Sequence, residues 1–144
     1  MAKKLPLKVK NIPDKDFLFR NFNLKLIIKL RGYSAHEVPI NAFRDEKGQG
    51  MSTAWEKYCS AKKLRRLSKA PKFNGVIKMN VGNIRKIPVL LVIHKPTMRN
   101  YGHSLIKGLP DNRAEKLKLR SRLKDLSEWV IPLNMTSVKS HFNI

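Results

Sequence analysis

The sequence is poor in cysteine, in acidic residues and in long apolar runs, and each shortage excludes a class of protein. Cys59 is the single cysteine among 144 residues. This excludes an internal disulfide and a cysteine-based zinc site, and it favours a reducing cytoplasm. The longest apolar stretches fall well short of the ~20 residues that a membrane span needs. No apolar segment with a small-residue cleavage site follows the basic residues 1–10, so we expect no signal peptide.

Acidic residues are the scarcer charged group by a wide margin. The chain has 31 Lys and Arg against 10 Asp and Glu, which gives a formal net charge of +21. Such an excess destabilises a compact domain by self-repulsion unless opposite charge neutralises it. Phosphate is the usual neutraliser, because cations release the counterions condensed on nucleic acid. The composition therefore predicts RNA or DNA as the partner, and it leaves an acidic protein or an anionic lipid surface as alternatives.

The organisation of the chain indicates a single domain. Hydrophobic residues make up 42% of the sequence, which is enough for one core at this length. We find no internal repeat and no Gly/Ser linker that would mark a boundary. We expect a basic N-terminal arm over residues 1–13, one α+β domain over residues 14–133 and a loosely held C-terminal tail over residues 134–144.

Short apolar runs bounded by turn residues predict the strands. The turn-rich segment from Arg31 to Gly50 separates two of them from the rest of the chain. Residues Asn83–Ile87 are expected to form a turn or a short helical piece before Pro88. The predicted strands are Phe17–Arg20, Leu24–Leu30, Gly75–Val81, Val89–His94 and Gly102–Lys107, the last two as a hairpin.

Capping-box spacing predicts the two main helices. Thr53 and Glu56 have this spacing at the start of a helix over residues 52–67. Asn112 and Glu115 have it at the start of a helix over residues 112–129, which Pro132 ends. Together the elements predict an α+β fold with a small mixed or antiparallel sheet of about five strands and two main helices.

The basic faces of the two predicted helices are the expected contacts with nucleic acid. No RNA-recognition motif, KH-type GXXG loop or zinc finger is present, so the predicted mechanism is electrostatic docking on phosphates, in a subunit of a larger nucleoprotein complex. The two tyrosines near these cations are the expected base-stacking residues. The predicted contacts are Lys62, Lys63, Arg65, Arg66, Lys95, Arg99, Arg113, Lys116, Arg120, Lys124, Tyr58 and Tyr101.

Two histidines supply an alternative in which the protein is an enzyme. His94 ends one strand of the predicted hairpin and His103 begins the other, so the hairpin is expected to bring both to one rim. Two imidazoles suit the cleavage of an RNA backbone without metal, one as general base and the other as general acid. The second interpretation of each histidine is an ordinary hydrogen bond at a strand end. The question of enzyme or binding module therefore stays open, with binding favoured.

The loop from His36 to Thr53 supplies a further candidate site. Its Gly48-Gln49-Gly50 stretch precedes the predicted helix start, where free backbone N–H groups favour a phosphate. The spacing of a P-loop is absent, and the glycines also suit a simple turn. No H-E-x-x-H or similar pattern is present, so we predict neither a cofactor nor a metal site.

Five strings of the sequence carry a resemblance, namely Phe17–Arg20, Ala42–Asp45, Met51–Tyr58, His94–Pro96 and Gly102–Ser104. They resemble a group of small uncharacterised prokaryotic proteins without an established activity. A second likeness links Arg20 and Ser52-Thr53 to the Arg and Ser-Thr elements of NAD-using ADP-ribosyltransferases, which would imply an enzyme of that class. That family also has a late acidic residue, and this chain has none between Glu56 and Asp111.

Overall fold

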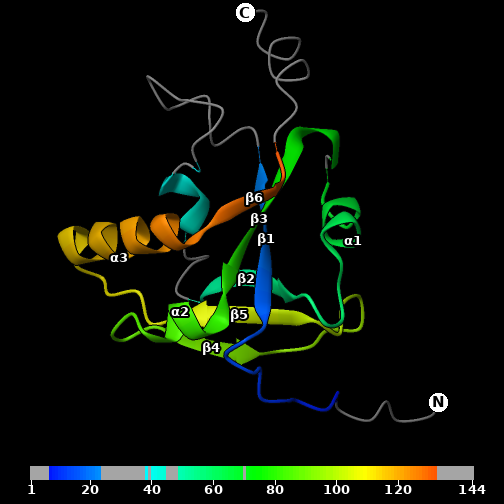
Figure 1. The fold of residues 1–144 in the computed structure, drawn as a ribbon, viewed down its shortest axis with the longest axis horizontal. Helices are drawn as coiled ribbons and strands as arrows, with labels where there is room; N and C mark the ends of the chain where they lie inside the picture. Colours follow the sequence, from blue (N-terminus) through cyan, green and yellow to red (C-terminus); the bar gives the residue numbers. More distant parts are fainter. Residues whose placement is uncertain (1–6, 24–37, 39, 45–48, 70, 133–144) are drawn as a thin grey trace, which may run out of the picture.

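In the part of the chain that the structure describes, six strands form a single antiparallel sheet in the order β4-β5-β2-β1-β3-β6, and three helices pack against it (Figure 1). The computed structural model describes residues 7–23, 38, 40–44, 49–69 and 71–132. The fold is the α+β class that the sequence predicts, with one strand more than expected. The strands are β1 (Phe17–Asn23), β2 (Met51–Trp55), β3 (Asn74–Asn80), β4 (Leu91–His94), β5 (His103–Lys107) and β6 (Glu128–Ile131). The helices are α1 (Ala61–Arg66), α2 (Val81–Arg85) and α3 (Arg113–Leu126), with 3-10 turns η2 (Ile40–Phe43) and η3 (Pro71–Phe73).

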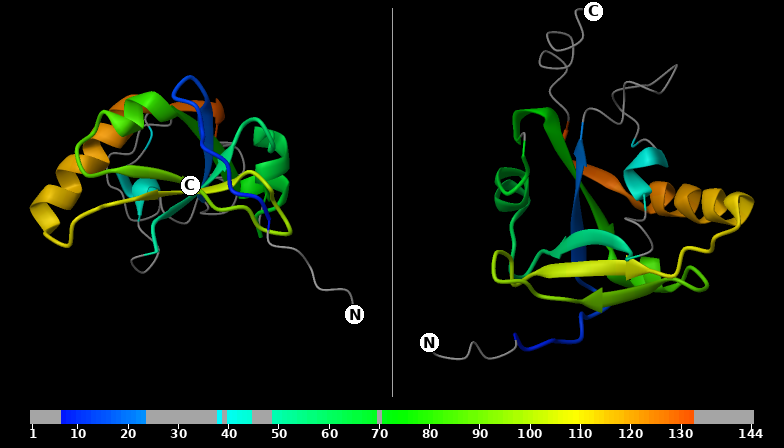
Figure 2. Two further views of the ribbon diagram at one scale, coloured as in Figure 1. Left: turned by 90° about the horizontal axis from the view of Figure 1, so that it is seen from below. Right: turned by 180° about the vertical axis from the view of Figure 1, so that it is seen from behind.

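The sheet is strongly twisted, so that β2, β5 and β4 cross the direction of β1 and β3 (Figures 1 and 2). Its two sides carry different helices. Helices α2 and α3 and the η2 turn pack on one side, which we call the core side. Helix α1 packs against β1 and β3 on the other, which we call the α1 side.

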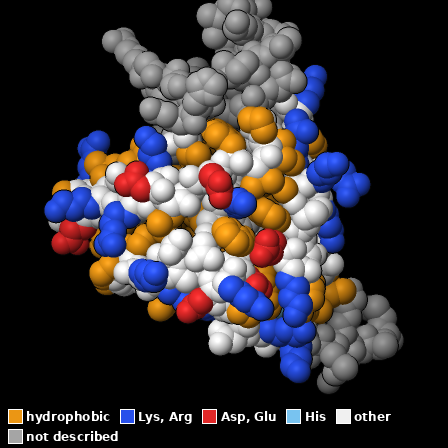
Figure 3. Space-filling model, viewed as in Figure 1, with side chains coloured by type: hydrophobic (Ala, Val, Ile, Leu, Met, Phe, Trp, Pro, Cys, Tyr) orange, Lys and Arg blue, Asp and Glu red, His pale blue; other side chains and the backbone are white. Residues whose placement is uncertain are grey.

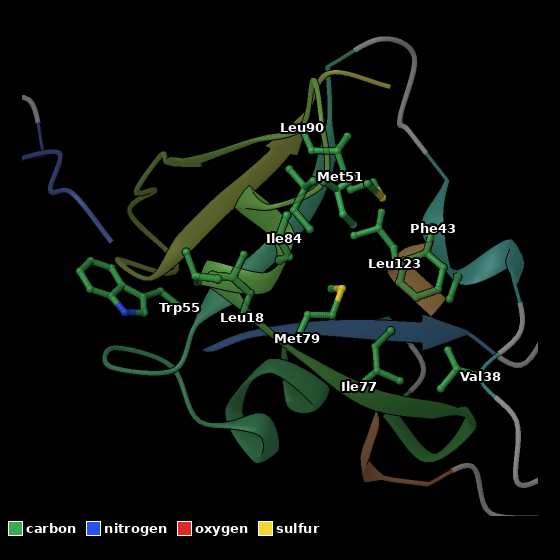
Figure 4. Close-up of a cluster of buried hydrophobic side chains, with 14 of the residues drawn as sticks. Leu18, Val38, Phe43, Met51, Trp55, Ile77, Met79, Ile84, Leu90 and Leu123 are labelled. Carbon is green, nitrogen blue, oxygen red and sulfur yellow. The ribbon is translucent and has the colours of Figure 1, made fainter. Parts of the chain in front are cut away.

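Alternation along β1 shows how the sequence produces these two sides. Leu18 and Phe22 are fully buried on the core side. Asn21 lies on the α1 side, where its side-chain Nδ2 donates to the Leu64 carbonyl oxygen at 3.0 Å. Side chains from β1, β2, β3, α2 and α3 converge in the core (Figure 4). Each fully buried aliphatic side chain contributes about 1.5–3 kcal/mol, so this cluster holds the helices on the sheet.

Four of the five predicted strands lie in the described residues, and the structure confirms them. Phe17–Arg20 is the first part of β1, and Gly75–Val81 corresponds to β3. Strands β4 and β5 form the predicted hairpin. The hairpin begins at Leu91 instead of Val89, because Val89 has a positive φ of 67° that interrupts an extended strand. The predicted strand Leu24–Leu30 and the tail over residues 134–144 lie outside the described residues.

The helix predicted over residues 52–67 is wrong in its first half. Met51–Trp55 is strand β2, which lies between β1 and β5 and is paired with both. The Thr53 hydroxyl donates to the Ser104 carbonyl oxygen at 3.1 Å instead of capping a helix. Helix α1 begins later, where the Ser60 hydroxyl accepts from the Lys63 N–H at 3.1 Å. Pairing with a strand on each side outweighs a local capping pattern, because it satisfies the whole backbone of the segment.

The helix predicted over residues 112–129 begins where expected but ends earlier. The Asn112 side-chain oxygen accepts from the Glu115 N–H at 3.0 Å, which confirms the predicted cap. The helix ends at Leu126, and Ser127 has extended backbone angles. Residues Glu128–Ile131 then pair with β3 as strand β6. The predicted continuation of the helix to residue 129 is therefore wrong.

Candidate functional site

The β4–β5 hairpin holds both histidines that the sequence singles out, but it presents them on opposite sides of the sheet. His94 is paired with Ser104, whereas His103 precedes Ser104 on β5. Because successive side chains of a strand alternate between the two sides, His94 faces the core side and His103 the α1 side. The hairpin therefore does not bring the two imidazoles to one rim, contrary to the expectation from the sequence.

His94 is a buried structural residue that ties the N-terminal segment to the hairpin. Only 3% of it is exposed, and its ring meets the Trp55 ring edge-on at 5.2 Å. Its Nδ1 accepts from the Lys10 backbone N–H at 2.9 Å. Its Nε2 lies 2.7 Å from the Tyr101 carbonyl oxygen, which can only accept a hydrogen bond. The proton is therefore on Nε2, and both ring nitrogens are committed to the backbone.

His103 has one ring nitrogen on the backbone and the other on a hydroxyl. Its Nδ1 lies 2.8 Å from the Lys95 carbonyl oxygen, so the neutral ring carries its proton on Nδ1. Its Nε2 lies 2.9 Å from Ser52 Oγ and accepts from that hydroxyl. The pair lies in a pocket of about 180 Å³. The pocket is lined by Gln49, Gly50, Ser52, Lys95, Pro96, Thr97, His103 and Leu105.

Arg20 fixes the strand that carries Ser52. Its buried guanidinium donates to the carbonyl oxygens of Ser52 and Ala42, each at 2.6 Å, and of Arg44 at 3.0 Å. These charge-assisted bonds hold β2 against the η2 turn. Arg20, which resembles the Arg element of the ADP-ribosyltransferases, thus has a structural role in this fold. Ser52, which resembles the first residue of that family's Ser-Thr element, lies on β2 inside the sheet.

A second group of side chains gathers at the end of the sheet where the N-terminal segment passes. We call Lys10, Lys57, Tyr58 and Tyr101 the tyrosine–lysine cluster. The two tyrosine rings meet edge-on at 4.7 Å between centroids. The Lys10 ammonium donates to the Tyr58 hydroxyl at 2.7 Å, and the Lys57 ammonium lies 5.5 Å from the centre of the Tyr58 ring. Lys10 and Lys57 are exposed and both tyrosines are half-buried.

The cluster changes the acidity of its members. The hydrogen bond from Lys10 lowers the pKa of Tyr58, and the positive charges of Lys10 and Lys57 lower it further. The same hydrogen bond to Tyr58 raises the pKa of Lys10. Both shifts have the direction expected when an ammonium group faces a phenol oxygen.

Two neighbouring residues allow the tyrosines to meet. A Cβ on Gly102 would lie 2.9 Å from the Trp55 carbonyl oxygen and 3.2 Å from the Tyr58 Cβ, so only glycine fits this close approach. The buried Asn100 side chain accepts from the Gly102 N–H at 2.9 Å and shapes the turn. Asn100 is therefore part of the framework that holds the tyrosines together.

The predicted nucleic-acid contacts do not form one surface. The predicted stacking residues Tyr58 and Tyr101 are brought together, as described above. Lys and Arg side chains gather over α1, over α3 and beside the N-terminal segment, on different parts of the molecule (Figure 3). The structure leaves Lys62, Arg66, Lys95, Arg99 and Arg113 exposed, whereas Lys63, Arg65, Lys116, Arg120 and Lys124 are half-buried.

Sequence reasoning missed several residues of these sites. Lys10 and Lys57 join the tyrosines, and Ser52 joins His103, although 51 residues separate that pair. On α3 the exposed cations include Lys118 and Arg122, which are not among the contacts predicted from the sequence. A local sequence pattern cannot predict the pair of Ser52 and His103, because the pairing of β2 with β5 in the sheet brings them together. The phosphate site predicted at Gly48-Gln49-Gly50 depends on a helix that begins after Gly50. The segment that begins at Met51 is strand β2 instead, so this prediction is wrong.

Comparison with protein-family models, curated proteins and solved structures finds no significant match for this chain. The resemblances drawn from its residues therefore stay predictions. In the part of the chain that the structure describes, no helix is both long and apolar enough to cross a membrane. The same residues contain no group of three or more His, Cys, Asp or Glu side chains arranged to hold a metal ion.

Proposed function

We propose that this protein binds nucleic acid, RNA or DNA, mainly through phosphates, and that the tyrosine–lysine cluster is the centre of the contact. The observation that carries the proposal is the meeting of two tyrosines with two lysines from distant parts of the chain. A nucleic-acid surface without sequence preference needs this combination of aromatic faces and cations. Exposed Lys95 and Arg99 lie on the loop that leads to Tyr101 and extend the positive charge.

The cluster suits a single strand better than a duplex. Half-buried tyrosines offer ring surface to unstacked bases, and stacking contributes about 1–3 kcal/mol per base. The bases of a duplex are already stacked and do not gain from such contact. Ammonium groups within 6 Å of the rings would neutralise the phosphates that flank a stacked base.

The whole chain supports the same partner. Its net charge of +21 remains unneutralised inside the molecule, because only 10 acidic residues face 31 cations. We place the protein in the cytoplasm, since its single cysteine is a buried free thiol, and we expect it to act within a nucleoprotein complex.

Fluorescence anisotropy with a labelled single-stranded RNA, a single-stranded DNA and a duplex tests the proposal. We expect the single strands to bind more tightly, with an affinity that falls about 10³-fold between roughly 50 and 200 mM salt. Lys57→Glu should weaken binding about tenfold and reduce the salt dependence by about one to two phosphate contacts, because it reverses one exposed charge.

Lys118→Glu on α3 is the matched control, because it makes the same change of net charge at another exposed lysine. Equal loss from both variants would mean that the total charge, and not the cluster, drives binding. A greater loss from Lys118→Glu would move the interface to α3. Absence of binding at low salt would contradict the nucleic-acid proposal altogether.

A further inference from the structure

Ser52 and His103 have the geometry of a nucleophile with its base. A hydroxyl becomes an effective nucleophile when an adjacent base can take its proton and a third group orients that base. Ser52 Oγ lies 2.9 Å from His103 Nε2, and the Lys95 carbonyl oxygen lies 2.8 Å from His103 Nδ1. The three groups thus form a continuous chain from hydroxyl to imidazole to backbone carbonyl.

The direction of these hydrogen bonds is fixed by chemistry. A carbonyl oxygen can only accept, so the bond to Lys95 puts the imidazole proton on Nδ1. The lone pair of Nε2 then faces the Ser52 hydroxyl, which donates to it. An orienting partner that holds the imidazole in this tautomer is what a general base requires.

The framework holds this pair in place. His103 and Ser52 lie on adjacent paired strands, and Arg20 holds the Ser52 carbonyl oxygen at 2.6 Å from the core side. Side chains on rigid strands keep a productive geometry better than side chains on loops. Arg20 is therefore a positioning residue for Ser52.

The pocket beside the pair limits what can react there. Its volume of about 180 Å³ accepts a short acyl group but not a nucleotide or a long chain. Leu105 and Pro96 supply apolar wall next to Ser52, and Leu105 is only 7% exposed. Gln49 and Lys95 also line the pocket, and both residue types carry N–H donors that suit an oxyanion.

We propose that Ser52 and His103 form a hydrolytic site for esters with a short acyl group. Ser52 Oγ attacks the ester carbonyl carbon while its proton passes to His103 Nε2. Collapse of the tetrahedral intermediate breaks the bond to the alcohol, which leaves with that proton, and the acyl group stays on Ser52. Water then attacks the acyl-serine, with His103 again taking the proton, and releases the carboxylic acid and free Ser52. This proposal does not depend on the tyrosine–lysine cluster, since Ser52 and His103 lie outside it and Lys95 is the residue that both proposals use.

Covalent labelling with a small alkyl fluorophosphonate tests the nucleophile directly. The activated hydroxyl displaces fluoride and forms a phosphonyl-serine, which mass spectrometry of the intact protein and its peptides locates. We expect one adduct, on Ser52, and none in Ser52→Ala. Ser121→Ala is the matched control, because Ser121 is exposed on α3 and its removal should leave labelling unchanged.

His103→Gln tests the base. We expect its labelling rate and its hydrolysis of p-nitrophenyl acetate to fall at least about 100-fold, with the circular dichroism spectrum unchanged. Labelling of Ser52 at an equal rate in His103→Gln, labelling at another residue or no labelling at all would each overturn the proposal.

Nitrogen NMR of the wild-type imidazole gives a result that needs no variant. We expect the His103 proton on Nδ1, as the carbonyl of Lys95 requires. A proton on Nε2 of the neutral ring would remove the acceptor for Ser52 and overturn the proposal, even where the variants fail to fold.

Discussion

The two histidines of one hairpin have opposite surroundings. His94 is buried on the core side, among the rings of Trp55, Tyr58 and Tyr101, and both its nitrogens bond to backbone groups. His103 is half-buried on the α1 side, and one of its nitrogens meets a hydroxyl in a pocket. The two rings also carry their protons on different nitrogens, Nε2 in His94 and Nδ1 in His103.

This difference teaches that the side of the sheet decides the use of a histidine. A ring on the core side must satisfy both nitrogens inside the protein, because an unpaired buried polar atom costs about 1–3 kcal/mol. A half-buried ring on the α1 side is not under this constraint, so one of its nitrogens can face a hydroxyl in a pocket. His94 is paired with Ser104 on β5, and His103 is the neighbour of Ser104 on that strand. A difference of one residue in strand position therefore separates the two situations.

His94→Ala should show the largest effect of the comparison. It removes a buried ring, leaves a cavity beside Trp55 and leaves the Lys10 N–H and the Tyr101 carbonyl without their partner. We expect a loss of about 2–4 kcal/mol in the free energy of unfolding, measured by urea denaturation. A loss below about 1 kcal/mol would show that His94 is not the tie between the N-terminal segment and the hairpin.

His103→Ala should affect stability much less. The ring is half-buried, and water can enter the pocket to replace its bonds to Ser52 and Lys95. We expect a loss of roughly 0.5–1 kcal/mol in the same urea experiment. If both histidine variants lost the same free energy, the contrast between the two sides of the sheet would fail.

The titration of Tyr58 should show the smallest effect, and it tests the surface that adjoins His94. Tyr58 is expected to ionise below the value of ~10 that is usual for tyrosine, because the Lys10 ammonium stabilises the tyrosinate. Lys10→Met removes that charge and hydrogen bond, so the pKa should rise toward the ordinary value. Ultraviolet difference absorbance against pH measures the shift. Lys86→Met is the control, because Lys86 is exposed at the end of α2, and it should leave the titration unchanged.

Local sequence patterns were sufficient to predict those elements whose formation does not depend on a distant segment of the chain. The Asn112 side chain accepts from the Glu115 N–H three residues later and so caps α3 locally, and the short apolar run of Phe17–Arg20 predicts a strand by itself. The same approach failed at Thr53, whose capping pattern with Glu56 is equally good in the sequence. There the backbone of β2 pairs with both β1 and β5, and local rules do not register two distant partners.

The sequence by itself determined the excess of positive charge, the α+β class and the strands β1, β3, β4 and β5, because these depend on composition and on short apolar runs bounded by turn residues. Only the tertiary structure decided which side of the sheet each histidine faces, which hydroxyl meets His103 and which lysines surround Tyr58. The physical reason is that strand register sets these contacts, and a shift of one residue moves every side chain to the other side of the sheet.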